Sequence, residues 1–413
     1  MTIFVTICSV IATLFTIYYL FTSFAGLLVK KHSPIPRQPA RSRIAAVIPA
    51  RNEGAVIGKL VESLLAQAYP RALFDIYVAP NNCTDDTEAV ARAAGANILH
   101  VEGPIRAKGD VLRGAFAQLS ATGKYDAYCV FDADNLVEKN FFQAVNDALA
   151  AGYQVGQGYR DSKNPYDGWV PGSLTAFYWF MSRFYNESRA RLGMSCHLNG
   201  TGIMVSDAVI RQIGWDTHTL TEDQEFTALC ALNDIKVGWM PNARIYDEQT
   251  TSFWASCVQR RRWTAGSMQC MRRYVPRLAK KHSVACLDMM MLFLGNLMCI
   301  IGLVPGIGTA LGLLPFFISH PWRILALVLV GGAYYLACCG AAAVMYRAEG
   351  RLNRRSLPGV FGFPIFMVSW MPINIFACLT PPPHWREIRH TRGIDRPDVE
   401  AEAIADREPD AGQ

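Results

Sequence analysis

Three short charged motifs follow one another along the chain, and their residue types could carry out chemistry on a diphosphate. They are Asp132-Ala133-Asp134, Thr221-Glu222-Asp223 and Gln259-Arg260-Arg261-Arg262-Trp263. In an extended chain, carboxylates two positions apart point to the same side, so Asp132 and Asp134 can share one hard cation with phosphate oxygens. Such oxygen ligands suit Mg²⁺ or Mn²⁺. The first motif therefore predicts a divalent metal site.

The second and third motifs could supply the remaining catalytic groups. Asp223, with Glu222 beside it, can act as a general base that takes a proton from an acceptor hydroxyl. Arg262 can neutralise a diphosphate leaving group, and Trp263 offers a stacking face. Structural interpretations also exist. Thr221 can cap a helix whose first turn favours acids, and the basic-aromatic run can be a collar at a membrane surface.

Two glycine-containing segments accompany these motifs. In Asn199-Gly200-Thr201-Gly202 the glycines permit close backbone approach to a ligand, although a tight turn before the strand at 203–205 explains them equally well. Lys108-Gly109 lacks the spacing of a phosphate-binding P-loop. Lys108 and Gly200 remain candidate ligand-contacting residues, but this sequence is not a P-loop.

The elements that must position these groups alternate along the chain. Apolar β-type runs alternate with segments of helical spacing, which is typical of an α/β fold with a mostly parallel sheet covered on both faces. The expected strands are 44–49, 74–79, 96–101 and 127–131, and the expected helices are 55–68, 86–94 and 108–119. Ligands bind beyond the carboxyl ends of such strands. Arg51, Asn81 and Asp132 all fall there.

Composition limits the class of protein. The hydrophobic fraction is 51% and the charged fraction 18%, so the chain is apolar for a soluble protein. A formal net charge of +6 does not favour a nucleic-acid partner. The 12 cysteines form no CxxC pair, which indicates reduced thiols in a cytosolic domain and a bilayer.

Several segments are long and apolar enough to cross a bilayer. Residues 3–29 end at Lys30-Lys31-His32, which predicts an uncleaved anchor whose carboxyl end faces the cytoplasm. Residues 284–318, interrupted by Pro305 and Pro315, predict one kinked span or a span plus an interfacial piece. Residues 324–346 form a cleaner span. Residues 359–379 predict either a crossing or a re-entrant segment.

These segments divide the chain into four regions. They are an anchor (1–30), a cytoplasmic catalytic domain (40–275), a membrane region of two to three spans or re-entrant segments (276–380) and a cytoplasmic or disordered tail (381–413). The basic runs beside the apolar segments set the topology, or alternatively bind a lipid or glycan acceptor.

The ordered set of motifs resembles that of membrane-bound family-2 glycosyltransferases, the group containing cellulose, chitin, hyaluronan and poly-N-acetylglucosamine synthases. The resemblance covers about residues 46–263 and the membrane segments. Its motifs are Pro49-Ala50-Arg51-Asn52-Glu53, Cys83-Thr84-Asp85-Asp86-Thr87, Lys108-Gly109, Asp132-Ala133-Asp134, Gly200-Thr201-Gly202, Thr221-Glu222-Asp223 and the QxxRW set Gln259, Arg262 and Trp263.

The resemblance implies a GT-A fold that binds a UDP-sugar and an inverting displacement at the anomeric carbon. Pro49, Ala50 and Glu53 would surround the nucleotide base and ribose. Lys108 and Asp132 would lie near the nucleotide and phosphates. Asp134 would ligate the metal, and Asp223 would be the base. The roles implied for Gln259, Arg262 and Trp263 are closure over the diphosphate and acceptor.

Two features depart from the family pattern. Many relatives carry an acidic residue where this chain has Asn81, whose amide still hydrogen-bonds but brings no charge. Asp85 could replace that acid if the loop shifts. Polymer-secreting relatives also thread their product through a channel of several helices. With three or four apparent segments, secretion here would need a homodimer or a transport partner.

The sequence thus predicts an integral protein of a bacterial plasma membrane with a cytoplasmic active site. The expected activity is transfer from a UDP-sugar donor to a growing β-linked polysaccharide. The alternative is addition of a single sugar to a lipid acceptor. A remote alternative is a non-catalytic membrane scaffold that senses a nucleotide.

Overall fold

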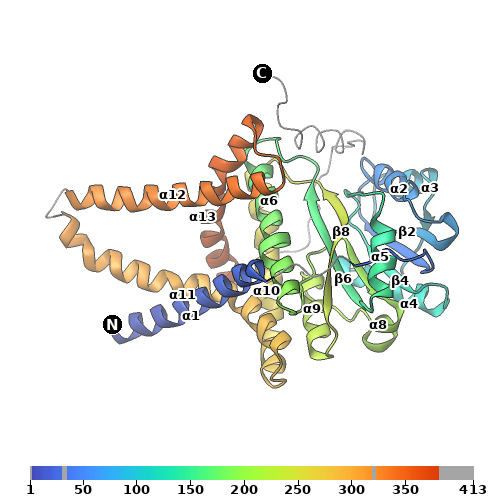
Figure 1. Cartoon of the computed structure of the whole chain (residues 1–413), viewed down its shortest axis with the longest axis horizontal. Helices are drawn as coiled ribbons and strands as arrows, with labels where there is room; N and C mark the ends of the chain where they lie inside the picture. Colours follow the sequence, from blue (N-terminus) through green and yellow to red (C-terminus); the bar gives the residue numbers. More distant parts are fainter. Residues whose placement is uncertain (1, 30–34, 319–321, 381–413) are drawn as a thin grey trace.

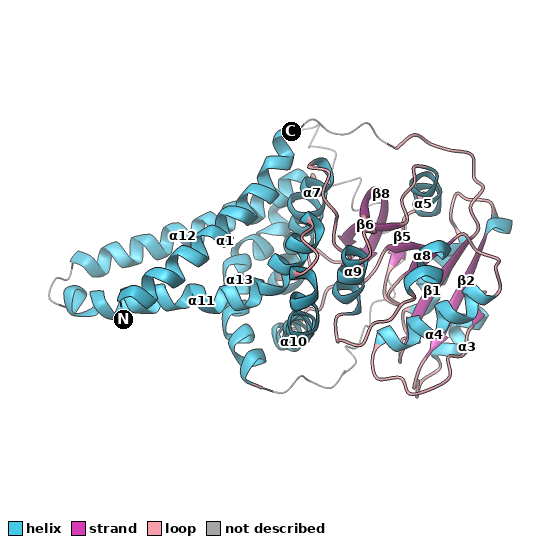
Figure 2. Ribbon diagram, turned by 90° about the horizontal axis from the view of Figure 1, so that it is seen from below, coloured by secondary structure: helices cyan, strands magenta, loops and turns pink. Residues whose placement is uncertain are grey.

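The structure, a computed structural model, describes residues 2–29, 35–318 and 322–380. An α/β domain forms one side of the molecule, and three long helices project from it (Figure 1). These are α1 (Thr2–Leu28), α11 (Val284–Ile318) and α12 (Trp322–Ala348). Figure 2 shows the same helices lying alongside one another from a second direction. The tail expected at 381–413 lies outside the described residues.

The domain is built on an eight-stranded sheet in the order β3-β2-β1-β4-β7-β6-β8-β5. The strands are β1 (Ile44–Ala50), β2 (Phe74–Pro80), β3 (Asn97–Ile98), β4 (Ala127–Val130), β5 (Leu136–Val137), β6 (Val155–Ser162), β7 (Ile203–Ser206) and β8 (Val237–Asp247). Four strand pairs are parallel and three, made by β7 and β5, are antiparallel. The expected α/β class with a mostly parallel sheet is confirmed.

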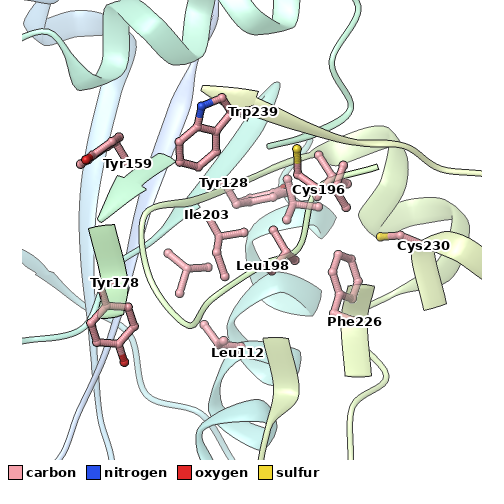
Figure 3. Close-up of a cluster of buried hydrophobic side chains, with 14 of the residues drawn as sticks. Leu112, Tyr128, Tyr159, Tyr178, Cys196, Leu198, Ile203, Phe226, Cys230 and Trp239 are labelled. Carbon is pink, nitrogen blue, oxygen red and sulfur yellow. The ribbon is translucent and has the colours of Figure 1, made fainter. Parts of the chain in front are cut away.

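Alternating side chains of β1 enter two separate apolar cores, because helices cover both faces of the sheet. Ala45 and Val47 belong to one core, which contains Tyr128, Ile203 and Phe226 (Figure 3). Ile44, Ala46 and Ile48 belong to the other. A strand buried on both faces reads as a continuous apolar run, which is why 44–49 was recognisable in the sequence.

The helices of the domain divide between these faces. On the second core lie α2 (Ile57–Leu65), α3 (Thr87–Ala93) and α5 (Phe141–Ala150). On the first lie α4 (Lys108–Ala121), α8 (Asp207–Ile213) and α9 (Glu222–Leu232). A 3₁₀ turn, η1 (Arg71–Leu73), precedes β2. Helices therefore cover both faces of the sheet.

A second group of helices joins the domain to the long helices. It comprises α6 (Trp169–Phe180), the π-helix η2 (Met181–Glu187), α7 (Ser188–Arg191), α10 (Phe253–Ala279), the 3₁₀ turn η3 (Arg354–Ser356) and α13 (Leu357–Leu379). The α10 helix runs across residue 275, where the catalytic domain was expected to end. The α13 helix is continuous through Pro364 and Pro372 and packs against α6.

Within the described part of the chain, three helices are long and apolar enough to cross a membrane: Ile3–Leu28, Val284–Gly302 and Arg354–Leu379. The expected span at 324–346 forms a helix within α12. The apolar stretch at 284–318 forms one helix rather than a span plus a separate piece.

One local expectation is wrong, and one alternative is met only in part. The third strand shrinks from 96–101 to Asn97–Ile98, because only those residues pair with β2 at the sheet edge. Thr221 stands at the N-cap of α9, but its side chain makes no capping hydrogen bond. Its hydroxyl instead lies 3.6 Å from the Cys270 sulfur on α10.

A buried charge cluster, here called the α11 cluster, fastens α11 and α1 to the domain. Asp288 of α11 accepts two hydrogen bonds from Arg189, at 2.9 and 3.0 Å. The hydroxyl of Tyr18 donates to Asp288 at 2.6 Å, and His197 Nε2 lies 3.0 Å from the same carboxylate. Arg189 is 0% and Asp288 2% exposed, so the pair is fully desolvated.

A second cluster, the hairpin cluster, docks the segment between α12 and α13. Asp161 of β6 accepts from Arg351 Nη1 at 3.1 Å and from Arg244 Nη1 at 2.6 Å. Glu349 accepts hydrogen bonds from Tyr159 and Arg183. Both helical attachments thus rest on carboxylates that are matched by guanidinium groups.

Candidate active site

A cavity of about 520 Å³ opens at the carboxyl ends of β1 and β4 and extends to α1, α11 and α13. Twelve of the sequence-predicted residues line it: Pro49, Glu53, Asn81, Lys108, Asp132, Asp134, Gly200, Glu222, Asp223, Gln259, Arg262 and Trp263. Ala50 does not, although its carbonyl oxygen accepts from the backbone and the side chain of Asn81, at 2.9 and 3.0 Å. The structure therefore brings residues from six of the seven sequence motifs, together with Asn81, to one place.

Lys108 is the centre of the charged end of the cavity. Its Nζ lies 2.5 Å from Asp132 Oδ1, 2.7 Å from the Gly200 carbonyl oxygen and 3.5 Å from Glu222 Oε1. Burial alone would lower the pKa of Lys108, but the Asp132 and Glu222 carboxylates outweigh burial and raise it. Conversely, Lys108 overcomes the effect of burial and lowers the pKa of Asp132. Both groups are therefore ionised.

Two glycines allow the motifs to meet here. A Cβ at Gly109 would lie 2.5 Å from Thr217 Oγ1 and 3.2 Å from the Cβ of Glu222. A Cβ at Gly266 would lie 2.6 Å from the Thr221 methyl carbon. Any larger residue would therefore push α4 or α10 away from the start of α9. Gly266 was not singled out in the sequence.

Hydrogen bonds fix the Asp132–Asp134 segment in the wall of the cavity. The backbone N–H of Asp132 donates to Thr201 Oγ1 at 3.1 Å, and the Asn135 amide donates to Asp134 Oδ1 at 3.2 Å. Among the described residues no three His, Cys, Asp or Glu side chains gather to enclose a metal. Two cavity-lining carboxylates nevertheless fit Mg²⁺ or Mn²⁺, since these ions take remaining ligands from phosphates and water.

Asp223 occupies a different electrostatic environment from Asp132. Burial, and then the negative charge of Glu222, raise the pKa of Asp223 to about 7. The backbone N–H of Gln224 donates to Asp223 Oδ1 at 2.8 Å, whereas Lys108 binds Asp132 instead. A carboxylate with a pKa near neutrality can accept a proton and still be deprotonated at physiological pH.

Arg160 and Asp247 form an ion pair in the cavity wall that was not expected from the sequence. Arg160 donates through Nε to Asp247 Oδ2 at 3.0 Å and through Nη1 to the Asn199 carbonyl oxygen at 2.7 Å. Its guanidinium carbon lies 3.9 Å from the Tyr178 ring centroid. The two residues are 87 positions apart, so their pairing is not apparent from the sequence. Charged residues within the buried strand β6 nevertheless require partners, and this was a signal that could have been used.

The α10 residues form the wall nearest the long helices. The Trp263 ring lies 6.2 Å from the Trp370 ring of α13 and 6.2 Å from the Tyr178 ring, between centroids. Arg262 lines the cavity and helps to lower the pKa of Asp132, after the larger effect of Lys108. The QxxRW residues thus bridge the charged end of the cavity and its aromatic end.

Several polar atoms in the wall are buried and have no hydrogen-bond partner in the described structure. They are both side-chain polar atoms of Asn199, Oε1 of Gln224 and Oε2 of Glu248. Buried polar groups are normally paired, so these groups are suited to bind a polar ligand.

Asp85 was suggested as a replacement for the missing acid at Asn81. Its carboxylate instead accepts hydrogen bonds from Gly54 N at 3.0 Å and from Thr87 N at 3.1 Å.

Comparison with known proteins assigns the chain to a family. Residues 39–266, more than half of the chain, match the family described as glycosyltransferase like family 2, and the chain belongs to this family. In the solved structures it is similar to a mannosyltransferase from Pyrobaculum calidifontis, determined with GDP-Man and Mn²⁺. The TM-score is 0.62 at 14% identity, covering 90% of this chain and 98% of that one. The expected GT-A-like fold is thereby confirmed.

Two curated relatives differ in coverage. The β-monoglucosyldiacylglycerol synthase of Synechocystis is 27% identical over 264 residues, which cover 60% of this chain and 54% of that protein. A probable glycosyltransferase of Bacillus subtilis is 21% identical and covers 84% of this chain and 83% of its own length. The chain thus spans about half the length of the glucosyldiacylglycerol synthases it matches.

Proposed function

We propose that the protein transfers one sugar from a nucleoside diphosphate sugar to a hydroxyl group of a membrane lipid. The observation that carries this proposal is a single cavity. It runs from Lys108 and Asp132, at the carboxyl ends of the central strands, to α1 and α11. A donor diphosphate suits the charged end, and a lipid suits the end formed by apolar helices. The names of the glucosyldiacylglycerol synthases support this single-sugar alternative over the expected polysaccharide.

The proposed reaction is one inverting displacement. The acceptor oxygen attacks the anomeric carbon while the bond from that carbon to the diphosphate oxygen breaks. The hydroxyl proton passes to the Asp223 carboxylate, whose pKa of about 7 suits a base. The nucleoside diphosphate leaves with the bonding electron pair, and Arg262 and Lys108 offset its developing charge.

Asp134, with Asp132, would hold Mg²⁺ or Mn²⁺ against the donor phosphates. The ion would neutralise phosphate charge when bound. Asp134→Ala should raise the Mn²⁺ concentration needed for donor binding by about 10-fold, measured by titration calorimetry with UDP. An unchanged metal requirement would remove Asp134 from the site.

We further propose that the domain faces the cytoplasm of a bacterial plasma membrane, in agreement with the basic residues that follow α1 and α12.

The test uses the full chain purified in detergent and radiolabelled UDP-sugars with a total membrane-lipid extract. We expect a labelled product that partitions into organic solvent and carries one sugar per lipid. A labelled water-soluble polymer would overturn the proposal in favour of polysaccharide synthesis. Donor binding without any transfer would point to a nucleotide sensor. Asp223→Asn serves as the inactive control because it retains the size of the side chain.

A further inference from the structure

Part of the cavity wall is formed by α1, α6, η2 and α11, and we call the compartment there the acceptor vestibule. It is lined by Tyr19, Phe180, Met181, Leu292, Gly295 and Asn296. We infer that this vestibule binds the acceptor lipid next to its reactive hydroxyl, that Asn296 anchors the polar linkage there, and that the site selects an uncharged headgroup. This inference rests on the proposed function and extends it to a substrate class.

The walls of the vestibule come from three helices that are far apart in the sequence. Tyr19 lies on α1, Leu292 on α11, and Phe180 and Met181 at the junction of α6 with the π-helix η2. The α1 and α11 helices pack against each other and α1 also contacts η2. Segments of π-helix occur frequently at functional sites because they displace side chains from the regular helical positions. The surface is suited to an acyl or prenyl chain.

Asn296 is the polar exception within this apolar surface. It lies inside the candidate span Val284–Gly302, and no hydrogen bond ties its side chain to the described part of the protein. Its amide is not sealed in the interior, since it is absent from the buried unpaired atoms and lines the cavity. Polar side chains within membrane helices are costly and usually face a partner or ligand. An ester, ether or hydroxyl group of a lipid supplies such a partner.

The distribution of charge favours a neutral acceptor. The cationic residues of the cavity wall all belong to segments at the donor end: Arg51, Arg106, Lys108, Arg160 and Arg262. Behind the vestibule, the charge of Arg189 is matched by Asp288. Burial lowers the pKa of His197 despite its contact with Asp288, so the ring is neutral. A phosphate in the vestibule would therefore lack a counter-charge and lose its hydration.

The first experiment compares acceptors that differ only in charge. Full-length protein in detergent receives the donor with diacylglycerol or phosphatidic acid, and separately with polyprenol or polyprenyl phosphate. We expect kcat/KM to be at least about 10-fold higher for the uncharged member of each pair that is used. Equal or better transfer to the phosphorylated lipids overturns the charge selection.

The second experiment tests the vestibule itself. Asn296→Leu removes the amide at nearly constant size, and we expect acceptor KM to rise about 10-fold, with donor KM and acceptor-independent donor hydrolysis unchanged. Gly295→Leu should block acceptor transfer while sparing that hydrolysis, since a Cβ there meets only Phe15, at 3.8 Å. Gly302→Leu is the matched control on the same helix, because a Cβ there meets nothing within 4 Å.

The outcomes separate this inference from the proposed function. If wild-type protein glycosylates lipids but Asn296→Leu and Gly295→Leu match Gly302→Leu, the vestibule is not the acceptor site. If wild-type protein glycosylates no lipid yet forms a water-soluble polymer, the proposed function fails, and this inference fails with it.

Discussion

The cavity and the two docking clusters both contain ion pairs, but the docking pairs are more deeply buried and the charges are matched differently. In the α11 cluster Asp288 is flanked by Arg189, and in the hairpin cluster Asp161 is flanked by Arg351 and Arg244. In the cavity, Lys108 binds Asp132, and the adjacent acids Glu222 and Asp223 repel each other.

This difference separates structural from chemical use of buried charge. A buried carboxylate that is fully matched by guanidinium groups stays ionised and holds elements together. A carboxylate left beside a like charge acquires a raised pKa and becomes able to exchange a proton. Asp223 belongs to the second kind, and the following substitutions test that contrast.

The largest expected effect is on catalysis at Asp223. Asp223→Asn removes the base at constant size, so kcat should fall on the order of 10³-fold. Donor affinity, measured by calorimetry with UDP, should stay within about twofold of wild type because the carboxylates proposed to bind the metal are untouched. Wild-type turnover in this variant would refute the assignment of the base.

The next largest effect is on stability at the α11 cluster. Asp288→Asn leaves the Arg189 charge buried without its partner, which should destabilise the protein by about 3–5 kcal/mol in thermal unfolding in detergent. The double variant Arg189→Met, Asp288→Leu should recover much of that loss, and activity should recover with stability. If stability returns but activity does not, the cluster has a chemical role and the comparison breaks down.

A smaller effect is expected at Glu222. Asp223 must be deprotonated to act as a base, so kcat/KM should be full above a pH of about 7 and fall below it. Glu222→Gln removes a negative charge that raises the pKa of Asp223, so the acid limb of the pH profile should move to lower pH. Complete loss of activity at every pH would instead identify Glu222 as the base. Thr217→Val, beside the same helix, is a control for packing.

The smallest effect is expected for an exposed pair. Arg92 donates to Glu88 at 2.9 Å on the surface of α3, where water screens both charges. Arg92→Ala should change the free energy of unfolding by less than about 0.5 kcal/mol, measured as in the Asp288 experiment. A loss of unfolding free energy as large as that expected for Asp288→Asn would show that burial does not determine how much an ion pair contributes to stability.

The sequence predicted the part of the molecule that depends on local pattern. The strand at 44–49 and the helix beginning at Lys108 emerge from apolar spacing, and the order of the motifs around Asp132 and Asp223 predicts one candidate site, which the cavity contains. These features succeed because each is encoded within a few consecutive residues.

Features that depend on long-range pairing were missed. Arg160 meets Asp247 across 87 positions, and Arg189 meets Asp288 across 99. Nothing local in the sequence specifies such partners, although the position of Asp288 inside the apolar run at 284–302 is a signal that could have been used. Thr221 carried a good capping pattern, yet its hydroxyl turns toward Cys270 because Gly266 brings α10 against it.

The alternation of side chains along β6 limits which insertions and deletions the gene can tolerate. Arg160 faces the cavity and its neighbour Asp161 faces the hairpin cluster, because successive side chains of a strand point to opposite sides of the sheet. Insertion or deletion of one codon between Val155 and Arg160 would exchange these directions, placing an acid in the donor site and a guanidinium beside Arg351. Length variation among homologues should therefore accumulate in the loops before and after β6, while the strand itself should keep a constant length.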